Sequence, residues 1–411
     1  MKVIVFSIII HLRMKKYYLL ILVLLTSCHP KSRSITNEMF VDSSSDTSCI
    51  VFEIKNNNLK NMEILDNLDE IVDKVEYIPL ETNSSSLIGL ISMMRFYKGK
   101  FYILDSHISK AIFIFNEDGT HFKTIANVGR GPTEYISPHY ISIDPFNDEF
   151  ILYDRNDDNL LYYDLDGNFI RKENVGIRLS NIVRITKEDF LIYFTTNVYN
   201  NPKVENHAVA IGVPPDSIKY VGLYKDEFYR NLYAYSQNIH VFGEKYFITS
   251  PFRNEIYQIL PDGKMFLRYR FEFEYGNQDI YRSIDNSEIE AFFNEIYARR
   301  IGFYYGSQFL DTERYLITSV SFGSDLHELI YDKKTRKTRM SKEIYENGKL
   351  ISMGLTPACA DGKTYYTTSP VSYILFQKGE REKKGYNFPE SLKGITEEDN
   401  PVIVKFTLHG E

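Results

Sequence analysis

The segment GRGPTEY, residues 129–135, combines residue types that suit the binding of a ligand. Its two glycines allow unusual backbone angles and close approach, and its proline stiffens the turn. The arginine offers a planar fork of N–H groups that matches a carboxylate or a sulfate. We therefore expect a candidate binding loop that uses Gly129, Arg130, Gly131, Glu134 and Tyr135.

The same segment can also be interpreted as a connector between structural repeats. In that case Arg130 pairs internally with Glu134 or with a neighbouring repeat, and the glycines serve only the turn. The segment is not a phosphate-binding P-loop, because no Gly-Lys-Ser/Thr sequence follows it and no helical pattern begins there.

Two patterns could hold a metal ion, and neither is complete. Asp154, Asn156 and Asp158 match the first three ligand positions of an EF-hand loop, but Asn159 stands where that loop requires glycine. We interpret these residues as a strand end followed by a turn. The histidines form no HxH or HExxH motif. A ring of repeats could still bring histidines together around a central channel, the candidates being His107, His139 and His240.

Catalytic signatures are equally sparse. The chain has no GxSxG elbow for a nucleophilic serine and no sialidase-type Asp box. A glycosidase pair cannot be identified among 55 acidic residues that are scattered along the chain. The chain contains no tryptophan, which argues against the docking motifs of quinone-cofactor enzymes. We expect no cofactor, and a binding role rather than catalysis.

The N-terminus resembles a bacterial lipoprotein signal. Lys15 and Lys16 precede an apolar stretch, residues 17–25, that is short for a membrane span, and the sequence Leu-Thr-Ser then ends at Cys28. In lipoproteins of that kind the cysteine becomes the mature N-terminus and carries acyl chains, so the resemblance makes Cys28 the lipidation site. The alternative is an N-terminal transmembrane helix with a coincidental cysteine. Translation could start at Met1 or at Met14.

Three parts of the chain follow from this interpretation. Residues 1–27 are a signal peptide, residues 28–49 a polar, Ser-rich flexible tether, and residues 50–411 the folded body. The two remaining cysteines, Cys49 and Cys359, are too few to predict a disulfide.

Composition limits the class of protein. The chain has 411 residues, of which 43% are hydrophobic and 25% charged, so it can bury a large core. Its 32 tyrosines and 28 phenylalanines favour strands over helices. A formal net charge of −7 argues against a nucleic-acid partner, which requires a basic surface.

The body repeats with a period of about 48 residues. Asp118-Gly119 and Asp166-Gly167 are one period apart, and Asp262-Gly263 follows two periods later. Asp-Gly between apolar runs predicts a β-hairpin with a type I′ turn. Later hairpins are expected at 331–340 and around Lys378-Gly379. Together these signals indicate six units of several short strands, which is typical of a β-propeller.

Two features interrupt or complete the repeat. Residues 276–306 carry apolar side chains at helical spacing, so we expect a short helical insertion between blades four and five, with Ser287 and Glu290 as its capping box. The C-terminal strand 402–408 is expected to pair with 49–54 or with 75–81, closing the ring and removing exposed sheet edges. The fold class is therefore all-β, a six-bladed β-propeller.

A known family shows the same features. The repeats, with Ile112 to Phe115 before Asp118-Gly119, resemble NHL-type repeats, and VEYIPLET (75–82) followed by GRGPTEYISPHYISID (129–144) resembles the six-bladed β-propeller lipoproteins of Bacteroidota. The resemblance covers roughly residues 70–410 and implies the fold, but no agreed activity. No acidic cluster follows Cys28, and in this family that implies an outer-membrane anchor facing the periplasm.

Two functions remain open from the sequence. The first is a tethered binding or scaffolding module for a glycan, a peptide or another envelope protein, held to the membrane by its lipid alone. The second is a metal-assisted lyase or hydrolase that acts at the central channel.

Overall fold

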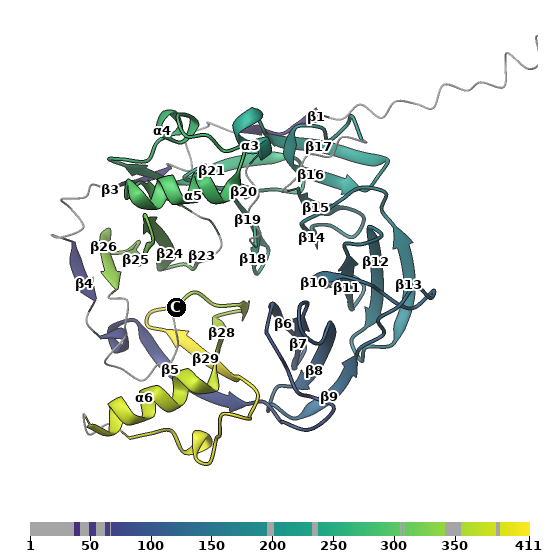
Figure 1. The fold of residues 1–411 in the computed structure, drawn as a ribbon, viewed down its shortest axis with the longest axis vertical. Coiled ribbons are helices and arrows are strands. Elements are labelled where there is room, and N and C mark those ends of the chain that lie inside the picture. The colour runs from purple at the N-terminus through teal and green to yellow at the C-terminus, as the bar shows by residue number, and fades with distance from the viewer. Residues whose placement is uncertain are drawn as a thin grey trace, which may run out of the picture. The chain divides into compact units, whose positions relative to one another are not determined.

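Six β-sheets surround a central channel in the computed structural model of the chain (Figure 1). The structure describes residues 37–41, 49–54, 62–65, 67–194, 201–231, 237–304, 306, 309–341, 355–383 and 387–411. Each sheet is one blade whose successive strands run antiparallel from the channel outwards. The predicted six-bladed propeller is confirmed.

The first two blades are regular four-stranded sheets. Blade one consists of β6 (Met93–Tyr97), β7 (Lys100–Asp105), β8 (Ala111–Asn116) and β9 (His121–Ile125). Blade two consists of β10 (Pro138–Asp144), β11 (Glu149–Asp154), β12 (Asn159–Asp164) and β13 (Phe169–Asn174). Their middle strands read as continuous apolar runs because neighbouring blades cover both faces.

Blades three to five have the same core of strands. Blade three contains β14 (Asn181–Arg184), β15 (Phe190–Tyr193), β16 (His207–Val213) and β17 (Ser217–Tyr224). Blade four contains β18 (Ile239–Phe242), β19 (Lys245–Thr249), β20 (Glu255–Ile259) and β21 (Lys264–Phe273). Blade five contains β22 (Gly302–Phe303), β23 (Phe309–Asp311), β24 (Tyr315–Phe322), β25 (Asp325–Asp332) and β26 (Lys337–Ser341).

Blade six joins the two ends of the fold. It consists of β27 (Cys359–Asp361), β28 (Thr364–Ser369), β29 (Val402–Leu408) and, outermost, β5 (Val72–Pro79). Strands β29 and β5 are antiparallel, with Val402 opposite Pro79 and Leu408 opposite Val72. The second of the two predicted closing strands is therefore the correct one.

Four short strands from the N-terminal part line the outside of blades three, four and five, and we call them the strap. They are β1 (Asn37–Glu38), β2 (Phe40–Val41), β3 (Ile50–Ile54) and β4 (Glu63–Leu65). β1 pairs with β17, β2 and β3 with β21, and β4 with β26, all in parallel. Residues 37–41, which belong to the interval predicted as a tether, thus form β1, β2 and the residue between them. Strand 50–54, the other candidate for closing the ring, instead covers an edge of blade four.

The repeated Asp-Gly turns differ from the predicted type I′. Among these pairs only the glycines have positive φ, +87° at Gly119, +76° at Gly167 and +84° at Gly263, and a register shift lies beside the first two turns. This is a type I turn followed by a glycine bulge, because the aspartate keeps negative φ. Asp118 accepts a hydrogen bond from the Thr120 N–H (2.9 Å), which stabilises that conformation.

Helices occur only in the connections of the described chain. They are α3 (Glu227–Asn231), α4 (Gln278–Arg282), α5 (Ile289–Ala298) and α6 (Val371–Lys383), with short 3-10 turns at Leu68–Glu70 and Glu390–Leu392. α4 and α5 form the predicted insertion between blades four and five, with Phe292 and Ile296 fully buried.

Two details of the helix prediction were wrong. Glu288, and not Ser287, is the N-cap of α5, and it makes no side-chain cap. The Ser287 N–H instead bonds to Asp285 Oδ1 (2.9 Å), so the chain turns before the helix begins. Lys378-Gly379 lies inside α6 and not in a hairpin, because Ile374 anchors that helix in the core.

Aromatic rings fill the spaces between blades. Phe96 of blade one stacks on Tyr366 of blade six with ring centroids 4.6 Å apart, and Tyr102 of blade one meets Phe150 of blade two at 5.0 Å. Such contacts add to the apolar area already buried. The tyrosine- and phenylalanine-rich composition therefore serves blade packing.

Gly119 is expected to be essential for this packing. A Cβ at Gly119 would lie 2.3 Å from the Pro79 carbonyl oxygen of β5, whereas one at Gly99 (φ +74°) would meet nothing within 4 Å. Gly99→Ala should cost about 1–2 kcal/mol of unfolding free energy for its positive φ alone. Gly119→Ala should cost about 3 kcal/mol or more, because overlap with β5 is added. Urea denaturation of both variants measures the difference, and equal losses would contradict the contact.

Candidate functional site

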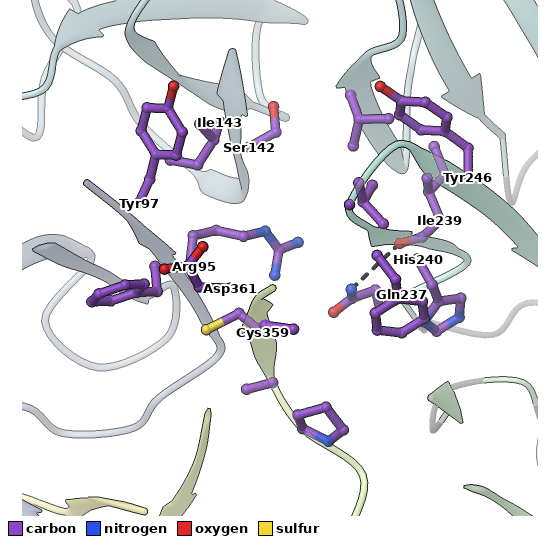
Figure 2. Close-up of a pocket in the computed structure, with 18 of the residues that line it drawn as sticks. Arg95, Tyr97, Ser142, Ile143, Gln237, Ile239, His240, Tyr246, Cys359 and Asp361 are labelled. Atoms are coloured by element: carbon purple, nitrogen blue, oxygen red, sulfur yellow. Dashed lines mark hydrogen bonds between the residues drawn. The ribbon is translucent and has the colours of Figure 1, made fainter. Parts of the chain in front are cut away.

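A cavity of about 290 Å³ lies at the centre of the ring (Figure 2). Every blade contributes its innermost strand to the wall. Each blade contributes at least one lining residue: Arg95 of β6, Tyr140 of β10, Arg184 of β14, His240 of β18, Phe309 of β23 and Cys359 of β27. The cavity therefore exists only when all six blades are assembled.

Most of the wall is apolar. Aromatic and aliphatic side chains surround the space, among them Phe96, Ile143, Val183, Ile239, Phe242 and Tyr246. Ser142 also lines it, and its Oγ, buried away from the open space, has no hydrogen-bond partner among the described residues. A concave, largely apolar site with a few polar groups is the usual form of a small-molecule binding site.

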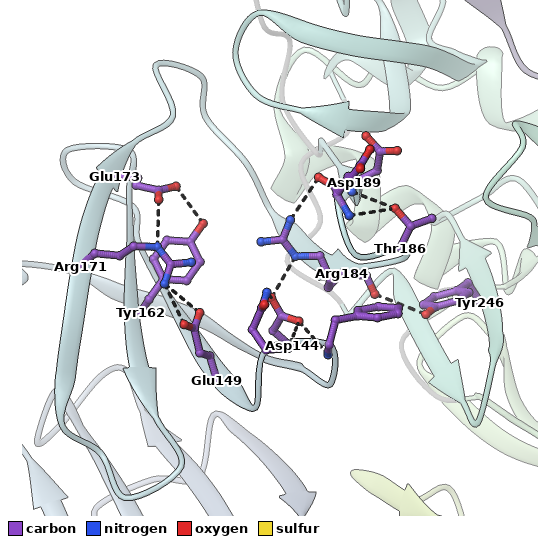
Figure 3. Close-up of polar contacts among 12 residues, drawn as sticks. Asp144, Glu149, Tyr162, Arg171, Glu173, Arg184, Thr186, Asp189 and Tyr246 are labelled. Atoms are coloured by element: carbon purple, nitrogen blue, oxygen red, sulfur yellow. Dashed lines mark hydrogen bonds and ion pairs between the residues drawn. The ribbon is translucent and has the colours of Figure 1, made fainter.

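Arg184 is the first of two arginines in the wall, and its charge is neutralised. Its Nε donates to Asp144 Oδ2 at 3.0 Å, joining blade three to blade two (Figure 3). Its guanidinium carbon also lies 3.5 Å from the ring centroid of Phe190. Asp144 is completely buried and accepts the Phe146 N–H as well. Because both ions are hydrogen-bonded, this pair can remain buried and fix the two strands together.

Arg95 is the second arginine, and its charge is not neutralised by any described residue. Its Nη1 donates to the Met94 carbonyl oxygen (2.9 Å) and its Nη2 to the Tyr140 hydroxyl (3.2 Å). Both acceptors are neutral, and no carboxylate of the described chain lies within ion-pair distance of it. Figure 2 shows the side chain extending into the open space between the walls.

His240 and Cys359 are neutral members of the wall at physiological pH. Burial lowers the pKa of His240 to about 4, and its Nε2 lies 3.0 Å from Thr249 Oγ1 and 3.3 Å from the Gly306 carbonyl oxygen. Burial also raises the pKa of the Cys359 thiol to about 12. Asp361, the exposed last residue of β27, is the one acidic lining residue in the described part of the cavity.

The proposed convergence of three histidines was wrong. His107 bonds to Ser106 Oγ (2.8 Å) and His139 packs against Tyr153, and neither lines the cavity with His240. Over the described ranges, no three His, Cys, Asp or Glu side chains gather in a way that could hold a metal ion.

Asp154 has the structural role that its position at a strand end predicts. Its carboxylate is fully buried and accepts the N–H groups of Ile136 and Ser137, at 3.0 and 2.9 Å, and that of Asn156. Asp105 ties together the equivalent loops of blade one in the same way. These oxygens are occupied by backbone donors, which does not fit a calcium ligand.

The candidate binding loop joins β9 to β10 and lies apart from the cavity lining. Glu134 Oε2 accepts the Gly131 N–H (2.6 Å) and lies over Gly129, where an added Cβ would be 2.1 Å away. Tyr135 is fully buried, with its hydroxyl 2.8 Å from the Lys110 carbonyl oxygen, so it is not available at the surface. Arg130 is exposed and pairs neither with Glu134 nor with any other described residue.

The three cysteines lie in different parts of the chain. Cys28 falls outside the described residues. Cys49 immediately precedes β3 at the outside of blade four, Cys359 lies in the inner strand of blade six, and both thiols are free.

Among the residues of the cavity, the sequence analysis named only His240 as a candidate functional residue. Arg95 and Arg184 carried a usable signal, because each is a charged residue in the short, otherwise mainly apolar first strand of a repeat, MMRFY and NIVR. In a propeller that first strand faces the channel, so a cation within it marks the channel wall.

Residues 49–407 match the sequence profile of a family described as a domain of unknown function, DUF4934. The chain belongs to the DUF4934 family. None of the curated proteins matches it.

One solved structure shows the same fold as this DUF4934 chain, and a second is more distantly similar. A protein of Bacteroides fragilis NCTC 9343 superimposes with a TM-score of 0.68 at 20% sequence identity, covering 87% of this chain and 99% of that one. The name of that protein describes it, by inference, as exported. A DUF4221 member from Bacteroides vulgatus ATCC 8482 has a TM-score of 0.45 at 13% identity, covering 82% and 97%. The first similarity supports the fold of the DUF4934 chain.

In the part of the DUF4934 chain that the structure describes, no helix is long and apolar enough to cross a bilayer.

His240 should make the fold sensitive to acid. Between pH 6.5 and about 4 the unfolded chain binds a proton that folded His240 does not, so the free energy of unfolding should fall by roughly 2–3 kcal/mol as the pH drops through this window. His240→Gln retains a side-chain N–H but cannot titrate, and its stability should fall less over the same range. Urea denaturation at several pH values measures this. An unchanged pH slope in the variant would show that His240 is not responsible.

Proposed function

We propose that this DUF4934 propeller is a binding module of the bacterial envelope that holds a small ligand in its central cavity. The observation that carries the proposal is the mostly apolar cavity of about 290 Å³ to which all six blades contribute. Because its wall consists of paired strands, the site is formed before a ligand arrives, which lowers the entropic cost of binding.

Binding accounts for the site better than the alternative, a metal-assisted lyase or hydrolase. That chemistry requires several ligands for one ion, and the described histidines lie in separate places. A neutral His240 held by Thr249 and Gly306 serves as part of a wall.

The envelope location rests on two supports. The Bacteroides fragilis protein of the same fold is named as exported, and the N-terminus of this chain carries the lipobox-like sequence that ends at Cys28. A lipid on Cys28 would hold the propeller close to the membrane. Asn37 of β1 follows Cys28 by nine residues, which span at most about 30 Å when fully extended. We place the anchor in the outer membrane, facing the periplasm, and keep the NHL-like interpretation of the repeats.

A protein, peptide or glycan partner would require a second contact on the surface. The loop that contains Arg130 is suited to this, because the Glu134 carboxylate is bonded to the Gly131 N–H within the loop, while Arg130 is exposed and unpaired among the described residues. An acidic group on the partner would match it.

Filling the cavity should abolish ligand binding without unfolding the protein. Val241 lines the cavity and is 40% exposed, so Val241→Trp adds a ring to the open space without displacing core residues. The matched control is Val51→Trp on the outer strand β3, where the valine is 45% exposed. Native mass spectrometry of protein purified from its host should show a bound small molecule in wild type and in Val51→Trp, and none in Val241→Trp.

The outcome of that comparison is decisive for the cavity. A ligand retained by Val241→Trp, or no ligand in any of the three proteins, would reject it as the binding site. The same preparations can be tested for bound envelope proteins, and a partner lost only in Arg130→Ala would assign the second contact to the loop.

Cys28 should determine attachment to the membrane. Cys28→Ala in the full chain should move the protein from the membrane fraction to the soluble fraction, because the acyl chains supply most of the anchoring free energy. Fractionation with immunodetection measures this, and Cys49→Ala is the control that should stay bound. Membrane retention of Cys28→Ala would contradict the lipid anchor.

A further inference from the structure

The donors of Arg95 are largely unused. A guanidinium carries five N–H groups, and in Arg95 only two of them have acceptors in the described chain, the Met94 carbonyl oxygen and the Tyr140 hydroxyl. Three N–H groups are therefore available to a ligand. They are carried by a side chain that is held in place by two hydrogen bonds and extends into the cavity.

Other arginines are treated differently. Arg184 pairs with the buried Asp144 in the channel wall. Even Arg171, away from the channel on the outer strand β13 of blade two, donates to both Glu149 and Glu173 at 2.8 and 3.0 Å (Figure 3). A partly buried cation without a counterion is costly, so proteins usually supply a carboxylate. Arg95 lacks one, and the missing anion is what a ligand can bring.

The remaining groups of the wall do not replace that anion. Cys359 and His240 are uncharged, and Asp361 is exposed in its hairpin beyond ion-pair distance of Arg95. A neutral wall also means that an anionic ligand meets one attractive charge with little competition from other residues.

The size of the cavity limits the ligand body. An engineered cavity of about 150 Å³ accommodates benzene. The space here is about twice as large and is bordered by the rings of Phe96, Tyr140 and Phe309. A flat body of two fused rings fits such a space.

We infer that the ligand of the central cavity is a small carboxylate with a flat apolar body, and that Arg95 binds its carboxylate. The inference rests on the proposed function, since it names the ligand class of the same cavity. The fork of free N–H groups suits the two oxygens of a carboxylate, and the aromatic walls suit the body.

Three probes with the same indole ring but different charge test this class. They are indoleacetate, its neutral amide indoleacetamide, and the cation tryptamine. Titration calorimetry with the wild-type propeller should show indoleacetate binding about tenfold to a hundredfold more tightly than the amide, because a hydrogen bond to a charged group is stronger than a neutral one. Tryptamine should bind most weakly.

Variants at Arg95 separate charge from shape. Arg95→Met keeps an unbranched apolar stem without the guanidinium and should bind indoleacetate no better than the amide, while Arg95→Lys should retain part of the preference. Arg299→Met is the control, because Arg299 is the C-cap of α5, outside the cavity, and pairs with Glu295 of that helix. Equal melting temperatures establish that the variants are folded.

A double-mutant cycle checks that Arg95 is free in solution. Arg95→Met and Asp361→Asn should have additive effects on stability, since the two side chains do not pair. A coupling between them would show that Asp361 is the counterion and would overturn the inference.

The outcomes distinguish a failure of the inferred ligand class from a failure of the proposed binding function. If all three probes bind equally and Arg95→Met changes nothing, the cavity binds ligands but does not select anions, and the inference fails alone. If none of the probes binds and no native ligand is found, the proposed function fails as well.

Discussion

Pairing between the two ends of the fold is the interaction on which the rest of the structure depends. β5 and β29 are separated by more than 300 residues of chain, yet they lie side by side in blade six. Their ladder gives blade six its outer strand and places the Pro79 backbone against the Gly119 turn of blade one. The central cavity depends on this closure, because β6 and β27 face each other across the joint.

The closed ring determines what the wall can do. Arg184 and Asp144 neutralise each other between blades three and two and make the wall rigid, whereas Arg95 of blade one has no counterion among the described residues. A rigid apolar wall with such a cation favours a ligand by shape and charge together. His240 and Cys359 remain neutral and add surface without adding charge.

Local signals in the sequence predicted the fold well. The Asp-Gly spacing located the outer hairpins of blades one, two and four, since each of these glycines lies at a positive φ beside the preceding blade. The spacing of Phe292 and Ile296 located α5. Lys378-Gly379 was misassigned because burial of Ile374 overrides the local preference for a turn.

The cavity was hidden from the same reasoning for a physical reason. A cation in the first strand of a repeat, such as Arg95 in MMRFY, marks the channel wall, but which side chains surround it depends on the register and closure of all six blades. The strap was equally hidden, because β1 and β2 have two residues each and show no periodicity. Their pairing is decided entirely by the distant strands β17 and β21.

The strap also determines how the molecule responds to force. A pull applied at Asn37 acts first on β1 and β2, which pair with blades three and four over two residues each, and on the buried Met39 between them. These pairs must separate before the load passes through β3 and β4 to β5. These short strands therefore detach first under tension. The N-terminal side can then lengthen while the joint that closes the ring stays intact.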